Sequence, residues 1–253
     1  MCGFGRLRYA SLFSQPPNSP GRSGLRVGLT GGLGSGKSTV AAMLAAHGAE
    51  IFSADELARS LMQPGQPVFT AIVDRFGPEV LRADGTLDRA ALARLAFVGG
   101  RIEELNAIVH PATIALQEKL TSEALARERD AIVIVESALI FETRYGNADP
   151  HQRAANEELK SWRTRFDRLI LVTAPEEEKI ARFIARSGAP ENDTAREALT
   201  SEARRRLAQM IPDAEKSPQC DYIVRNDGTL DQLRGHVDSV WRALRAVASE
   251  PAN

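Results

Sequence analysis

The sequence has few of the features that distinguish exported, membrane or metal-rich proteins. It contains only two cysteines, Cys2 and Cys220, whose positions toward opposite ends of the 253 residues suggest neither a disulfide framework nor a metal site. No apolar run reaches the roughly 18 residues that a membrane helix needs, and the N-terminal residues lack the apolar segment of a secretory signal. The net charge of -1 gives no general reason to expect nucleic acid or an anionic membrane as a partner. We therefore expect a cytoplasmic, globular protein.

The first 24 residues differ in composition from the rest of the chain. They carry prolines at positions 16, 17 and 20 among Ser, Gly, Asn and Gln, and we predict a disordered extension over residues 1–24. A transit peptide, or a start codon upstream of the native one, would explain the same composition. We expect the folded domain to span residues 25–248.

The clearest motif lies between Gly31 and Ser38, where GGLGSGKS matches the phosphate-binding loop G-x-x-x-x-G-K-[ST]. An apolar, β-branched run precedes it and a helix-forming run follows, and a plain glycine-rich turn would not need Lys and Ser at these offsets. The glycines let successive N–H groups point into one concavity at a helix N-terminus, which suits a polyphosphate. We expect Lys37 to bridge the outer phosphates and Ser38 to be a ligand of Mg²⁺. The residues expected to bind the nucleotide here are Gly32, Leu33, Gly34, Ser35, Gly36, Lys37, Ser38 and Thr39.

The rest of the chain alternates between strand-like and helix-like segments. Further strands are expected at 49–53, 131–135, 169–172 and 221–224. This alternation predicts an α/β fold with a mostly parallel five-stranded sheet flanked by helices. About sixty residues between the second and third strands have only helical periodicity, more than one crossover needs, so we predict a helical lobe over 64–129. The polar stretch 143–165 is expected to be a surface excursion.

Several charged residues are candidates for chemistry. Asp55 follows the second strand, at the end where open α/β sheets place their ligands, and fits either a proton acceptor or the N-cap of the next helix. Glu136 ends the third strand, where phosphate-loop enzymes hold or orient Mg²⁺, usually through Asp. Arg182 and Arg186 share one helix face. They fit either a mobile lid over the phosphates, which we place at 182–210, or a solvated basic face.

In combination these segments resemble the dephospho-CoA kinase family, from about Leu25 to about Val247. Besides the loop, the matching segments are ADELAR at 54–59, PG at 64–65, ADGTLDR at 83–89, LNAIVHP at 105–111, LIFE at 139–142, RLAQ at 206–209 and NDG at 226–228. The resemblance implies a P-loop kinase fold. It also implies ATP-dependent phosphorylation of the ribose 3′-hydroxyl of dephospho-CoA, the last step of coenzyme A biosynthesis.

The resemblance also implies roles for individual residues. Asp55 matches the acidic residue proposed as general base, and Arg186, with Arg182 behind it, matches the lid arginines that approach the phosphates. Asn226 and Gly228 match the loop that borders the adenine of ATP. The helical lobe would help to hold dephospho-CoA. The expected metal is Mg²⁺, and we expect a monomer. His110, before a proline, is expected to be structural.

Some positions depart from the family pattern, and other functions stay open. Ser53 and Glu136 stand where the family commonly has Asp, and Ala138 replaces a proline. Another small-molecule kinase of the same fold, or a nucleotide-binding switch that hydrolyses ATP slowly, would share the loop. A GTPase is disfavoured because the chain lacks the Asn/Thr-Lys-x-Asp segment of guanine-specific switches. A nucleic-acid ATPase is disfavoured by the net charge.

Overall fold

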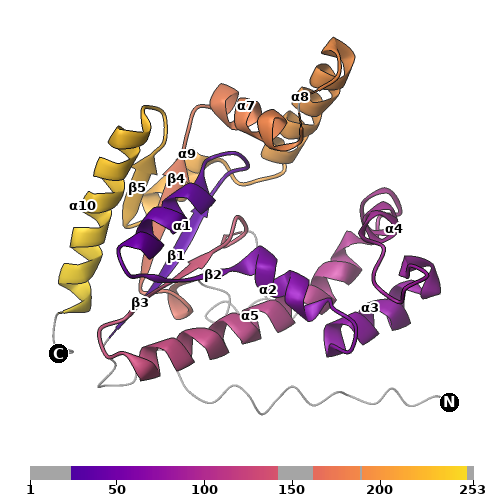
Figure 1. Ribbon diagram of the computed structural model, residues 1–253, viewed down its shortest axis with the longest axis horizontal. Coiled ribbons are helices and arrows are strands. Elements are labelled where there is room, and N and C mark those ends of the chain that lie inside the picture. The colour runs from indigo at the N-terminus through magenta and orange to yellow at the C-terminus, as the bar shows by residue number, and fades with distance from the viewer. Residues whose placement is uncertain (1–23, 142–161, 189, 250–253) are drawn as a thin grey trace.

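The computed structural model describes residues 24–141, 162–188 and 190–249. The predicted disorder of 1–24 therefore falls almost wholly outside the described residues, and so does most of the predicted surface excursion. At the centre is a five-stranded, fully parallel sheet in the order β2-β3-β1-β4-β5 (Figure 1). Its strands are β1 (Leu25–Gly31), β2 (Glu50–Ser53), β3 (Ile132–Glu136), β4 (Arg168–Thr173) and β5 (Tyr222–Arg225). The predicted fold class is confirmed.

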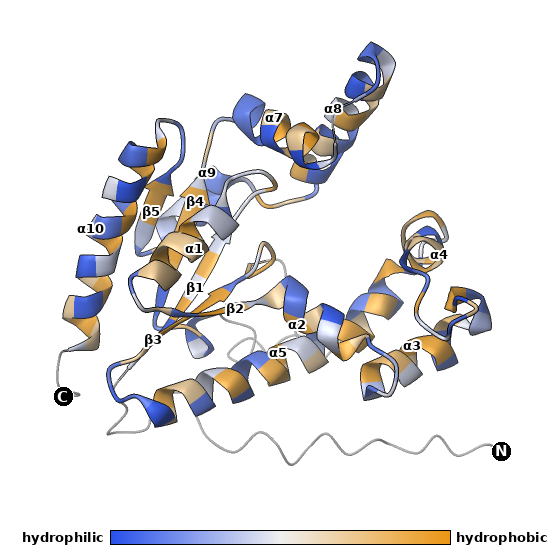
Figure 2. Cartoon of the chain, viewed as in Figure 1, coloured by the Kyte–Doolittle hydropathy of each residue, from blue (hydrophilic) through white to orange (hydrophobic). Residues whose placement is uncertain are grey.

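Helices cover both faces of the sheet because the central strands are apolar throughout. Alternate residues of β1 and β3, such as Leu29 and Ile134, pack with α1 (Lys37–Ala46) and α10 (Leu230–Ala248). On the other face, Val133 packs against the C-terminal part of α5 (Ile102–Arg127). Figure 2 shows hydrophobic residues along the strands and on the side of α10 that faces them. This packing therefore fixes the helices on both faces of the sheet relative to the C-terminal ends of the strands.

A second hydrophobic core holds the helices between β2 and β3. These are α2 (Ala54–Leu61), α3 (Pro67–Phe76), α4 (Arg89–Ala93) and the N-terminal part of α5, with a 3-10 turn at Pro78–Val80. We call this region the helical lobe. In this lobe α4 begins at Arg89 because the Asp88 side chain caps it, accepting from the N–H groups of Ala90 and Ala91. It continues as a π-helix over Arg94–Val98.

Two helices stand over the loop that follows β1. They are α7 (Glu176–Arg186) and α8 (Asp193–Ala208), held together by Ile180, Ile184 and Ala203. The chain returns to the sheet through α9 (Asp213–Lys216) and a 3-10 turn at Ser217–Gln219; another 3-10 turn, Trp162–Thr164, precedes β4. Among the described residues, none of the helices has the length and apolarity needed to cross a membrane.

Candidate active site

The loop between β1 and α1 has a backbone that only glycine adopts easily. Gly34 and Gly36 have φ values of 71° and 95°, in the left-handed region. A side chain on Gly34 would also overlap the backbone carbonyl of Lys179, which lies closer than van der Waals contact permits. Because Gly36 is the N-cap of α1 and has no side chain, the first N–H groups of the helix are left for a bound anion.

Lys37 folds back over this loop. Its Nζ donates to the carbonyl oxygens of Gly31 and Gly32 at 2.9 and 3.1 Å. Burial lowers the pKa of Lys37 to about 8, although the negative charges of Glu136 and Asp55 oppose the shift. The predicted phosphate-bridging lysine is therefore within electrostatic range of both candidate carboxylates.

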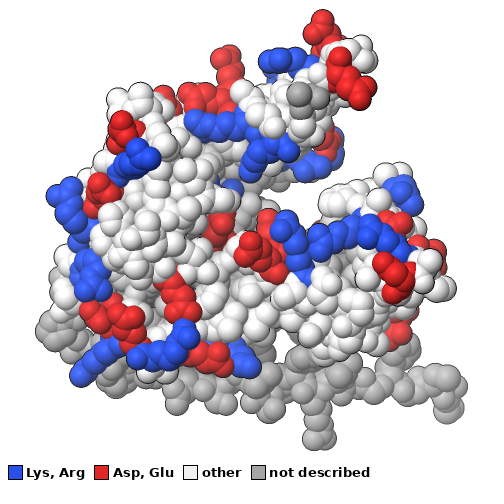
Figure 3. Space-filling view, in the orientation of Figure 1, with Lys and Arg blue, Asp and Glu red and all other residues white. Residues whose placement is uncertain are grey.

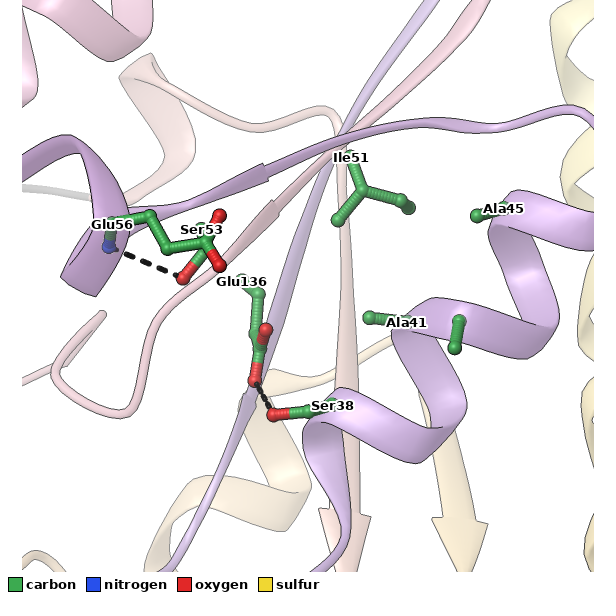
Figure 4. A pocket seen from close by; sticks show the side chains of 8 residues that line it. Ser38, Ala41, Ala45, Ile51, Ser53, Glu56 and Glu136 are labelled. Carbon is green, nitrogen blue, oxygen red and sulfur yellow. Dashed lines mark hydrogen bonds between the residues drawn. The ribbon is translucent and has the colours of Figure 1, made fainter.

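Ser38 and Glu136 meet at the edge of the sheet. The Ser38 hydroxyl donates to Glu136 Oε1 at 2.8 Å. Both side chains line a cleft of about 290 Å³, in which Figure 4 shows them pointing toward each other. Glu136 reaches this point because β3 pairs with β1 and β2 in a register that sets Glu136 beside Leu29 and Ser53. The cleft is also lined by Ala41, Ala42, Ala45, Ile51, Ser53 and Glu56.

Asp55 is the second residue of α2 and is exposed. Its alternative role as N-cap is wrong, because Ser53 caps the helix by accepting from the N–H of Glu56 at 3.5 Å. The serine that replaces an expected acid thus has a structural use, and the Asp55 carboxylate is left facing solvent. In Figure 3 acidic side chains line the hollow between the helical lobe and the α7–α8 pair, and basic ones follow the rim of the lobe.

The two candidate arginines of α7 have different surroundings. Arg186 lies near enough to Lys37 for its charge to lower the pKa of Lys37 further. Arg182 turns instead toward the loop after β5, where Nη2 donates to the backbone carbonyl of Asn226 at 2.9 Å and pairs with Glu178. Arg186 therefore approaches Lys37, whereas Arg182, one helix turn earlier on α7, contacts the loop after β5.

Asn226 and Gly228 follow β5, at the C-terminal edge of the sheet. The Asn226 Nδ2 donates to the Ser35 carbonyl of the phosphate-binding loop at 2.8 Å. Gly228 lies against the Gln232 side chain, which closes a capping box with Thr229 at the start of α10. The sequence predicted both residues beside ATP, and the structure brings Asn226 to the loop itself.

Two buried lysines beside the loop were missed by the sequence reasoning. Lys179 Nζ pairs with Asp213 Oδ2 at 2.5 Å, and Thr173 Oγ1 donates to the same oxygen at 2.7 Å. A Cβ on Gly32 would lie 3.3 Å from Lys179 Nζ. Lys216 is fully buried, and its charge also acts on Lys37. A lysine in a charged helical segment is expected to face solvent. The burial of Lys179 and Lys216 is therefore evident only in the structure.

The parallel sheet, the glycine loop capping α1 and the Lys37–Ser38–Glu136 group define the class of P-loop nucleotide-binding α/β proteins. The dephospho-CoA kinase family model matches residues 25–150. A dephospho-CoA kinase of Symbiobacterium thermophilum is 39% identical over 86% of this chain and 80% of its own length. That of Corynebacterium jeikeium is 39% identical over 87% of this chain and its full length.

Solved structures share the fold of this chain. The Thermus thermophilus protein TT1252 is 31% identical, with a TM-score of 0.64 over 88% of this chain and 98% of that one. A dephospho-CoA kinase from Campylobacter jejuni, 18% identical, has a TM-score of 0.50 over 87% of this chain and 96% of its own, which supports the fold. The chain belongs to the dephospho-CoA kinase family.

Proposed function

We propose that this chain transfers the γ-phosphoryl group of ATP to the ribose 3′-hydroxyl of dephospho-CoA, which completes coenzyme A. The observation that carries the proposal is the group formed by Lys37, Ser38, Glu136 and Asp55 at one edge of the sheet, in a chain of this family. The phosphate-binding loop supports ATP as the phosphoryl donor. The family relation, together with an exposed carboxylate beside the loop, supports an alcohol acceptor.

The chain's own residues are suited to an in-line transfer that needs little covalent chemistry from the protein. The loop N–H groups and the start of α1 would hold the phosphates, and Lys37 would exchange the Gly31 and Gly32 carbonyls for phosphate oxygens. Asp55 would accept the proton of the attacking hydroxyl. Arg186, in the lid that we propose over residues 182–210, would spread the developing charge.

The Ser38 hydroxyl and the Glu136 carboxylate fit Mg²⁺, which prefers oxygen ligands. When bound, the ion would neutralise charge on the phosphates. In the described part of the chain no group of three or more His, Cys, Asp or Glu side chains could hold a metal. A site completed by substrate phosphates suits Mg²⁺ because proteins usually give it only one or two carboxylates. We assign Ser38 as a ligand of Mg²⁺ and Glu136 as the hydrogen-bond partner of that ligand.

The helical lobe is proposed to hold dephospho-CoA, since Asp55 lies in the first turn of α2, where the lobe follows directly from β2. The decisive experiment measures ADP release with ATP and Mg²⁺, with and without dephospho-CoA, and identifies the product by mass. We expect strong stimulation by dephospho-CoA and a product heavier by one phosphoryl group. Stimulation by shikimate or a nucleoside monophosphate instead would point to another small-molecule kinase. ADP release that no acceptor stimulates would indicate a nucleotide-binding switch.

Changing Glu136 to Gln should raise the Mg²⁺ concentration for half-maximal rate by about tenfold, because partners of a metal ligand typically affect metal affinity this much. The Gln side chain keeps the size of Glu but not its charge. Titrations of ATP at a series of Mg²⁺ concentrations would check the result, because the variant should need about tenfold more Mg²⁺ for the same gain in ATP affinity and should keep its metal-free affinity. Glu128→Gln, an exposed carboxylate before β3, is the matched control. An unchanged Mg²⁺ requirement in Glu136→Gln would contradict the assignment.

A further inference from the structure

The side chain of Asn226 occupies the space beside the phosphate-binding loop that a side chain at position 36 would need. A Cβ on Gly36 would overlap the Asn226 amide. The amide nitrogen donates to the Ser35 carbonyl at 2.8 Å, across 191 residues of sequence. The contact therefore joins the loop after β5 to the peptide group between Ser35 and Gly36.

That peptide group has two ends that point in opposite directions. In a planar trans peptide the C=O of Ser35 and the N–H of Gly36 are antiparallel. By holding the carbonyl, the Asn226 amide turns the Gly36 N–H to the side away from Asn226. We take this to be the side on which the loop N–H groups would meet phosphate. Gly36 has a φ of 95° and lacks the Cβ that restrains other residues, so the peptide could otherwise rotate and present its carbonyl to the phosphates.

Asn226 is itself held by its backbone. Its N–H donates to the Thr173 carbonyl at 2.8 Å, and its carbonyl accepts from Arg182 Nη2 at 2.9 Å. Neither contact uses the carboxamide, so truncating the side chain leaves both anchors in place. Arg182 thus links α7 to the same peptide group through Asn226.

We propose that Asn226 is a positioning residue for the phosphates of the nucleotide, acting through the Ser35–Gly36 peptide of the loop. The inference rests on the proposed binding of ATP there and is independent of which acceptor the enzyme uses. It goes beyond a location beside adenine, because it assigns the carboxamide to the phosphate end of the nucleotide. Arg182 acts one step further back, by fixing the backbone of Asn226.

The test separates the two ends of the nucleotide by using three probes: inorganic tripolyphosphate, ADP and adenosine. Their affinities are measured by calorimetry, or by ligand-observed NMR where binding is weak, for the wild type, Asn226→Ala, Asn226→Asp and Asp227→Asn. Asp227 is an exposed neighbour on the same loop and serves as the control. Thermal unfolding of each variant establishes that it is folded.

In Asn226→Ala, tripolyphosphate and ADP should each bind about tenfold to hundredfold more weakly, the range for losing one hydrogen bond to a charged group. Adenosine should bind as it does to the wild type. Asn226→Asp should lose more, because a carboxylate facing the Ser35 carbonyl repels it and drives the peptide to rotate. Asp227→Asn should stay within about twofold of the wild type, as expected for an exposed surface change.

Other outcomes overturn the proposal. If adenosine and ADP weaken equally while tripolyphosphate binds normally, the carboxamide contacts the base. If all three probes bind normally, Asn226 does not orient the loop, and if all three weaken by the same factor in a folded variant, its effect is not specific to phosphate. None of these measurements involves dephospho-CoA, so an error in the assigned acceptor would be recognised separately, in the ADP-release assay.

Discussion

Replacing Asp55 by Asn is expected to lower turnover by about 10²- to 10⁴-fold, the usual contribution of a general base, while ATP affinity changes little. Asn keeps the shape of Asp but cannot accept the hydroxyl proton. Asp55 is also free of the helix-capping task, which Ser53 performs, so the substitution should leave α2 intact. Steady-state kinetics with dephospho-CoA and calorimetry with ATP would measure the two effects separately.

Asp74→Asn is the matched control for this prediction. Asp74 is an exposed carboxylate on α3 of the same lobe, so it reports the effect of removing one negative charge from that region. Its turnover should stay near that of the wild type. If Asp55→Asn keeps its turnover within about threefold of the wild type, the loss is far smaller than a general base's contribution. The proton acceptor would then have to be another group.

The sheet could be predicted because its signals are local. Parallel strands covered on both faces are apolar throughout, and the runs at 131–135 and 169–172 have no other ready interpretation in a chain of this composition. The loop is local too, since its glycines and the Lys-Ser pair occupy fixed offsets. These segments became β3, β4 and the β1–α1 connection with bounds within a residue or two of those expected.

The contacts between distant segments could not be predicted in this way. The Ser38–Glu136 hydrogen bond depends on the register of three strands. The hydrophobic pattern alone does not determine that register to within one residue. The spacing correctly placed Arg182 and Arg186 on one face of a helix. It could not predict that Arg182 contacts Asn226 while Arg186 approaches Lys37. The Asp55 alternatives were separable only once Ser53 was seen to cap the helix.

These long-range contacts share a physical feature. Each joins the loop region to an element far away in sequence: Glu136 from β3, Asn226 from the β5 loop and Lys179 from α7. The loop's glycines make its backbone permissive, so its shape must be imposed from outside. The residues that supply this support are ordinary in the sequence, and their role follows from burial and geometry.

Replacing Lys37 by Met is expected to lower kcat/KM for ATP by about 100-fold or more, the effect of removing one donor to transition-state charge. Met preserves much of the side chain's length and its apolar stem, so the packing around the loop should survive. The loss should occur in turnover as well as in ATP binding, because the lysine would contact the transferring phosphoryl group. Activity near that of the wild type would refute the assignment of the site.

The pH dependence of ATP affinity gives a second measurement on the same variant. In the free protein burial lowers the pKa of Lys37 to about 8, and bound phosphate, being negative, raises it. Below this pKa the lysine is protonated with or without ATP, so it adds no pH dependence; above it, binding takes up a proton and affinity falls, by up to about tenfold per pH unit. Calorimetry between pH 7 and 10 should show this decline in the wild type. The decline should disappear in Lys37→Met, and its persistence there would assign the titration to another group.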